Sequence, residues 1–137
     1  MEPGDLLFLT EPYNEYVHKR NPGLKINLTN RLAKLEEIID WESEKGKIIK
    51  KAREDSGKWT GLSIEDCKYI VSIYHYDLTG RKGQKGVAER GVPLFTNDPE
   101  TGRPFFMKVP EWIYKDIMKK CENFSVALKK GELDVDR

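Results

Sequence analysis

The run "YIVSIYHY" at residues 69–76 decides the fold that the sequence predicts, because two patterns compete there. Its β-branched and aromatic residues favour a strand. The residues before it favour a helix, since Ser63 is a good N-cap and Glu65 and Asp66 suit the positive first turn. Four residues would then share one helical face: Cys67, Ile70, Val71 and Tyr74. We therefore predict a helix over residues 63–75, with a strand as the alternative.

Toward the N-terminus the same helical spacing recurs. Four apolar residues are separated by four, three and four positions, which places them on one face of a helix: Leu28, Leu32, Leu35 and Ile39. The lysine-rich segment "EKGKIIKKARED" at residues 44–55 either continues this helix or forms a second one, and Gly57 is a plausible end. Further upstream, "DLLFLT" at residues 5–10 predicts a short buried strand.

Two connections flank that strand and the first helix. "EPYN" at residues 11–14 is a turn signal, and "HKRNPGLK" at residues 18–25 reads as a basic loop because Asn-Pro-Gly disfavours both helix and strand. We therefore expect a turn at residues 11–14 and a loop at residues 18–25.

The C-terminal third predicts a hairpin and a helix. "VPLFT" and "RPFFMKV" flank the turn "NDPETG" at residues 97–102, which indicates two short strands paired by a loop. A helix should begin near Pro110 and end at Gly131, with the tail at residues 131–137 frayed. Its apolar face repeats at four, four, three and four residues: Ile113, Ile117, Cys121, Phe124 and Leu128.

Together these elements predict an α+β fold, with three to four helices packed on a small antiparallel β-hairpin or sheet. At 137 residues the chain is long enough for one core, so we expect a single globular domain over residues 1–137. The start of the chain lacks the basic region of a secretory signal, and no apolar run reaches the roughly 18 residues of a membrane span. We expect an intracellular protein, in cytoplasm or nucleus.

Metal and cofactor motifs are not found in the sequence. Its two cysteines and two histidines lie too far apart for zinc-ligand spacing. His75, Tyr76 and Asp77 could place an imidazole near a carboxylate, which makes a small enzyme the third-ranked hypothesis. We expect no cofactor, no metal and no catalytic residue.

The glycine-rich segment at residues 78–91 is the main candidate for binding. Its glycines do not have the spacing of a nucleotide-binding loop, because neither Gly-Lys-Ser/Thr nor Gly-x-Gly-x-x-Gly occurs. A flexible basic loop can instead contact the phosphates of nucleic acid. Four side chains would make these contacts: Arg81, Lys82, Lys85 and Arg90.

Our leading hypothesis is thus a non-catalytic protein that contacts nucleic acid through this loop. A basic helix face would support it through Lys47, Lys50 and Lys51. The net charge of +1 argues against a strongly basic coat, so the hypothesis depends on whether the basic segments meet. The alternative is a small accessory or inhibitor protein that acts through protein contacts. The candidates for that interface are Tyr13, Tyr16, Trp59 and Phe105.

Overall fold

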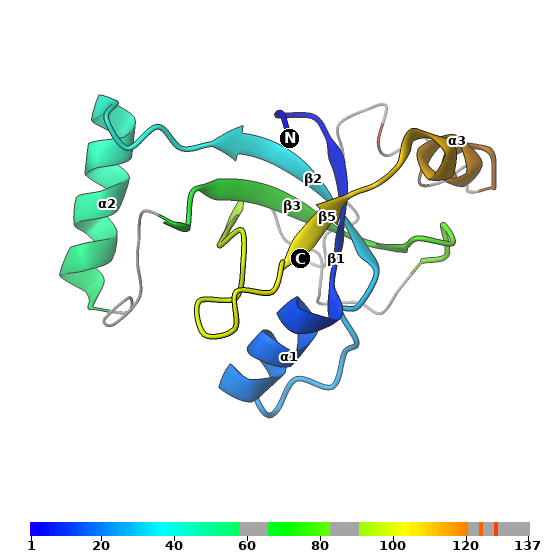
Figure 1. The fold of residues 1–137 in the computed structure, drawn as a ribbon, viewed down its shortest axis with the longest axis horizontal. Helices are drawn as coiled ribbons and strands as arrows, with labels where there is room; N and C mark the ends of the chain where they lie inside the picture. The colour runs from blue at the N-terminus through cyan, green and yellow to red at the C-terminus, as the bar shows by residue number, and fades with distance from the viewer. Residues whose placement is uncertain (58–65, 83–90, 121–123, 125–127, 129–137) are drawn as a thin grey trace.

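The computed structural model describes residues 1–57, 66–82, 91–120, 124 and 128. Within these residues the fold is α+β, with three helices and one five-stranded antiparallel sheet (Figure 1). The strands are β1 (Leu6–Leu9), β2 (Arg31–Ile38), β3 (Tyr69–Asp77), β4 (Val92–Leu94) and β5 (Phe106–Lys108). The helices are α1 (Glu11–Arg20), α2 (Glu44–Ser56) and α3 (Glu111–Lys120).

The run at residues 69–76 belongs to strand β3, so the helix predicted over residues 63–75 is wrong wherever the structure describes it. β3 lies inside the sheet order β4-β3-β2-β1-β5. Both of its faces are buried: Val71 and Ile73 pack into one apolar cluster, and Tyr74 and Tyr76 into another. A strand covered on both sides has no polar face to alternate with its apolar one. Its β propensity was therefore the informative signal.

The helix predicted from Leu28 to Ile39 is also wrong, because residues 31–38 form strand β2. Leu32 and Leu35 are three residues apart and thus point to opposite faces of a strand, where both faces are covered. Register shifts between Arg31 and Ala33 and between Leu35 and Glu37 further interrupt the pairing with β3. Burial on both faces produced the helix-like spacing.

Helix α1 occupies the segment for which we predicted a turn. Thr10 has the extended backbone of an N-cap, Glu11 lies in the positive first turn, and Pro12 stands at a position that needs no amide donor. The "EPYN" signal therefore marks a helix start. The predicted strand before it is confirmed as β1 (Leu6–Leu9), and the predicted basic helix is confirmed as α2, which ends at Gly57 in the left-handed conformation.

The two C-terminal strands do not pair with each other. β4 pairs with β3, while β5 pairs with β1 at the opposite edge of the sheet. The loop between them does fold back as predicted, since the Asp98 amide donates to Arg103 (2.7 Å) and the Phe105 amide donates to Thr96 (3.0 Å). The expected hairpin is thus a turn that connects two edges of one sheet.

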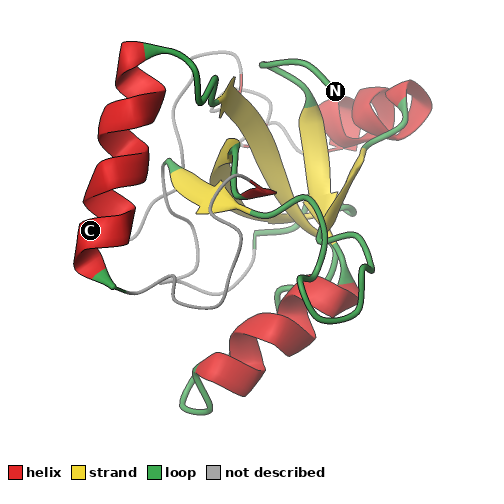
Figure 2. Ribbon diagram, turned by 60° about the vertical axis from the view of Figure 1, so that its left-hand side comes forward, coloured by secondary structure: helices red, strands yellow, loops and turns green. Residues whose placement is uncertain are grey.

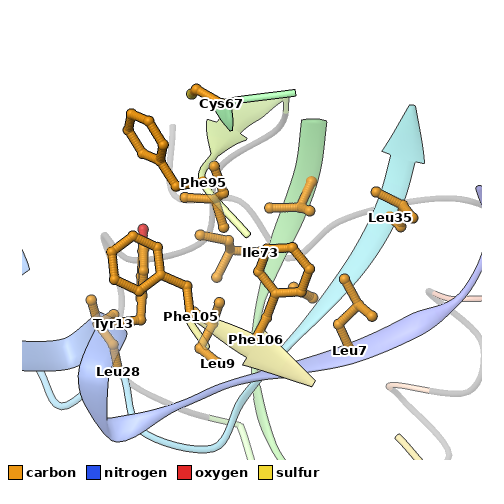
Figure 3. Packing of buried hydrophobic residues seen from close by; sticks show 13 residues of the cluster. Leu7, Leu9, Tyr13, Leu28, Leu35, Cys67, Ile73, Phe95, Phe105 and Phe106 are labelled. Carbon is orange, nitrogen blue, oxygen red and sulfur yellow. The ribbon is translucent and has the colours of Figure 1, made fainter. Parts of the chain in front are cut away.

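Apolar side chains cover both faces of the sheet. On one face, residues of the strands meet Tyr13 of α1 and Phe105 of the β4–β5 connection (Figure 3). On the other face Ile117 of α3 packs against Leu6, Leu32 and Tyr74. Figure 2 shows α1 and α3 on different sides of the strands. In the described part of the chain, no helix is long and apolar enough to cross a membrane.

Candidate nucleic-acid interface

The first residues of the glycine-rich segment form a tight turn at the end of β3. The Gly80 amide donates to the Asp77 carbonyl (2.9 Å), and the Asp77 amide donates to the Arg81 carbonyl (3.2 Å). Gly80 has a φ of 80°, which a residue with a side chain adopts only with strain. Residues 77–82 are therefore held by backbone hydrogen bonds, whereas Lys85 and Arg90 lie outside the described residues.

The Asp77 carboxylate also organises this turn. It accepts hydrogen bonds from the Thr79 amide (2.9 Å), the Thr79 hydroxyl and the Arg81 amide (3.3 Å). Burial acts to raise the pKa of Asp77, but these hydrogen bonds and the Arg81 charge outweigh burial and lower it. The charged carboxylate of Asp77 thus fixes the backbone conformation of the turn that carries Arg81.

Arg81 and Lys82 are both exposed. The Arg81 side chain donates from Nε to the Thr79 hydroxyl (3.2 Å), and its two Nη groups have no hydrogen-bond partner among the described residues. The planar end of the guanidinium therefore remains open to an external acceptor.

Helix α3 lies at the same end of the molecule as this turn (Figure 1). Leu78, inside the turn, packs against the apolar cluster that contains Ile117 and Phe124. α3 carries three exposed lysines: Lys115, Lys119 and Lys120. Lys115 pairs with Glu111 (3.5 Å) and Lys120 with Asp116 (2.9 Å), while Lys119 forms no ion pair with any described residue.

The supporting lysines predicted on α2 lie elsewhere. Lys47 and Lys51 are exposed and Lys50 is half-buried, and Figure 1 shows α2 and the 77–82 turn at opposite ends of the long axis. A third basic pair lies on α1, where Lys19 and Arg20 both form ion pairs with Glu100 (3.3 and 3.0 Å). The structure therefore brings the Arg81 turn close to α3 and keeps it away from α2.

The aromatic residues predicted as a protein interface are mostly internal. Phe105 has no exposed surface and Tyr13 is buried beside it, with ring centroids 5.4 Å apart. Tyr16 is half-buried between Phe105 and the guanidinium of Arg20, which lies 3.5 Å from the ring centroid. Trp59 lies outside the described residues. Tyr13, Tyr16 and Phe105 therefore hold α1 against the rest of the fold.

The residues considered for enzyme chemistry are also internal. His75 is 1% exposed within β3, and its carbonyl accepts a hydrogen bond from the buried Arg31 (2.9 Å). Burial raises the pKa of the Cys67 thiol to about 11, which suppresses the reactive thiolate. The described ranges contain no group of three or more histidine, cysteine or acidic residues placed to hold a metal ion.

Sequence reasoning missed the outer face of α3 as a candidate site. The lysines near its end were visible, but without the fold nothing linked them to Arg81. The signal that could have found it is the placement of Trp112 on the polar side of an otherwise regular apolar helix pattern. Searches of protein-family models, of curated protein sequences and of solved structures give no match to this chain.

Proposed function

We propose that this protein binds nucleic acid non-catalytically through one basic end, here called the turn–α3 surface. Five cations define it: Arg81, Lys82, Lys115, Lys119 and Lys120. The observation that carries the proposal is that Leu78 of the turn and Ile113 of α3 pack against the same apolar cluster, at one end of the molecule. Phosphate contacts of this kind provide affinity and register without reading sequence.

Two features suit this surface to phosphate. Arg81 stands on a backbone fixed by its own hydrogen bonds, so little of its ordering entropy remains to be lost on binding. The ion pairs of Lys115 and Lys120 are at the surface, with lysine side chains 69% and 65% exposed. Such pairs contribute only about 0–1 kcal/mol each, so phosphate can replace the carboxylate as partner.

The experiment is a titration of a labelled 20-nucleotide single strand and the matching duplex by fluorescence anisotropy, at 50 and 200 mM salt. We expect the affinity to fall steeply with salt as counterions are released. The double variant Arg81→Ala, Lys82→Ala should bind more weakly. It should also lower the magnitude of the salt slope by about one for each phosphate that the variant can no longer neutralise.

The matched control is the double variant Lys47→Ala, Lys51→Ala on α2. It removes the same number of cations from the opposite end of the molecule, and we expect it to retain most of the affinity. Binding that ignores salt would overturn the proposal. Equal weakening by both double variants would also overturn it, because net charge rather than the turn–α3 surface would then explain binding.

A further inference from the structure

Arg31, the first residue of β2, carries a charged group and yet is only 5% exposed. One of its Nη atoms donates to the His75 carbonyl of β3 (2.9 Å), and the other donates to the Asn27 carbonyl (3.2 Å). Burial lowers the pKa of Arg31, and the negative charge of Asp77 opposes this shift. An apolar side chain of similar size often stabilises a core as well as a buried ion does, so core packing alone does not explain this guanidinium.

The two contacts of this guanidinium connect the end of β3 to a turn that is itself firmly held. The turn at residues 27–30 precedes β2, and its Asn30 amide donates to the Leu9 carbonyl of β1 (2.8 Å). Its Leu28 amide donates to the side chain of Asn14 on α1 (2.8 Å). The guanidinium therefore links β3 to a segment that is already fixed to a strand and to a helix.

On β3, the contact lies directly before the turn that carries Arg81. His75 precedes Asp77 by two residues, and Asp77 is the cross-strand partner of Arg31. Residues directly opposite each other in an antiparallel pair lie on the same face of the sheet. Burial tends to raise the pKa of Asp77, and the hydrogen bonds and charge that lower it come from Thr79 and Arg81. Arg31 therefore acts on the place of Asp77 rather than on its ionisation.

We infer that Arg31 is a positioning residue for the turn–α3 surface: its guanidinium connects the 27–30 turn to the end of β3 and so fixes where Asp77 holds Arg81. The positioning of the turn stands by itself, whereas its consequence for binding rests on the proposed function. Because Arg31 is buried, it contacts no phosphate directly. A guanidinium suits this role, since its planar fork reaches two carbonyls at once and a lysine ammonium is a single point of contact.

The first test measures amide hydrogen exchange at Thr79 and Arg81, whose amides donate to the Asp77 carboxylate. We expect Arg31→Met to speed exchange at both amides by roughly 2- to 10-fold, the change that corresponds to one lost hydrogen bond. Arg31→Lys keeps the charge but reaches fewer carbonyls, so it should show part of this change. If Arg31→Met does not fold, Arg31→Lys provides the same test. The matched control is Ile73→Val, which removes one methyl group from the buried core of β3 and should leave both turn amides as in the wild type.

The second test repeats the titration of the labelled 20-nucleotide strand with the same variants. Arg31→Met should weaken binding by roughly 2- to 10-fold, because the long side chain of Arg81 must then be ordered on binding. The salt slope should stay that of the wild type, since no phosphate contact is removed. The double variant Arg81→Ala, Lys82→Ala should lower the slope, which distinguishes a contact residue from a positioning residue.

The outcomes separate this inference from the proposed function. Unchanged exchange at Thr79 and Arg81 in Arg31→Met would overturn the inference, whatever the protein binds. Equal acceleration in Ile73→Val would also overturn it, because general loosening of β3 would then explain the effect. Faster exchange with wild-type affinity would refute the role of Arg31 in binding. A wild type that binds neither strand nor duplex would refute the proposed function, and the exchange rates would still decide whether Arg31 positions the turn.

Discussion

Helices α1 and α2 each connect two strands that pair in the sheet, yet the two helices are held against the sheet in different ways. α1 places Tyr13 in the core against Phe105, and Tyr16 stacks between that ring and Arg20. Ion pairs to the 97–102 turn and its flank strengthen the same contact, from Arg20 to Glu100 (3.0 Å) and from Glu15 to Arg103 (3.4 Å). α1 is thus bound by apolar burial with charges at its rim.

No residue of α2 belongs to either apolar cluster of the described residues. Its start is fixed by Ser43, whose hydroxyl accepts from the Gly46 amide (3.0 Å), and by the close approach of Gly46 to Asp40. Further along, Arg53 donates to the Cys67 carbonyl (3.0 Å) and lies over the ring of Trp41. Backbone fit and polar contacts, rather than core side chains, hold this helix.

The contrast teaches that a helix sequence can be a poor guide to how the helix is held. α1 has a proline at its second position and carries few aliphatic residues, but two tyrosines are enough to make it part of the core. α2 has good caps at both ends and an isoleucine, Ile48, that is mostly exposed. Local capping made α2 predictable, while tertiary burial of tyrosine determines α1.

The largest effect in this comparison should come from Phe105→Ala. The ring is fully buried and contacts both tyrosines of α1, so its removal leaves a cavity beneath the helix. We expect a loss of about 3–5 kcal/mol in the free energy of unfolding, measured by urea denaturation. Ile48→Ala on α2 is the control and should change stability by less than about 0.5 kcal/mol. A loss below about 1 kcal/mol for Phe105→Ala, well under the usual range for a buried ring, would mean that α1 is not held through this ring.

A smaller effect is expected from Gly46→Ala at the start of α2. A Cβ there would lie 2.0 Å from the Asp40 carbonyl oxygen, a backbone atom that cannot swing aside. On an open helix surface alanine would gain about 1 kcal/mol over glycine, so a net loss of about 1–3 kcal/mol would report the clash. Amide hydrogen exchange should show faster opening of α2 than of β3.

Gly23→Ala is the matched control for that substitution. Its Cβ would meet only the side chain of Asn21, at 3.7 Å, which is ordinary van der Waals contact. We expect its free energy of unfolding to stay within about 0.5 kcal/mol of wild type. A neutral or stabilising Gly46→Ala would indicate that α2 can shift away from Asp40 without penalty, and α2 would then be held less closely than its backbone contacts imply.

The sequence predicted the elements whose signals are local. Gly57 was predicted as the end of α2 and is its C-cap, and the apolar spacing of Ile113 and Ile117 marks the buried side of α3. The signals for β2 and β3 were ambiguous because both sheet faces are covered. Even the polar Ser72, between Val71 and Ile73, is buried, so no exposed polar face marks the strand. Only the pairing of strands distant in sequence resolves that ambiguity.

The same distinction between local signals and long-range packing applies to the candidate site. The exposure of Arg81 and Lys82 follows from their place beside a glycine turn, which the sequence displays. That this turn lies at the same end of the molecule as α3 depends on Leu78 packing across the fold, which no local pattern encodes. The basic segment of α2, equally visible in the sequence, is placed at the other end of the molecule.

The smallest effect concerns the charges at the rim of α1. Hydrogen bonds from Arg20, followed by those from Lys19, lower the pKa of the Glu100 carboxyl below its ordinary 4.5. A carboxyl whose pKa is lower in the folded protein stabilises the fold above pH 4.5, and this contribution disappears as the pH falls through the lower folded value. Glu100→Gln should therefore lower the Tm slightly at pH 7, and this difference should shrink as the pH falls toward 3. Scanning calorimetry at both pH values, with and without 1 M salt, would measure this. The screening length at 1 M salt is about 3 Å, so added salt should also reduce the difference at pH 7. A Tm difference that persists at pH 3 would show that Glu100 acts through packing, and α1 would then depend on its rim for more than charge.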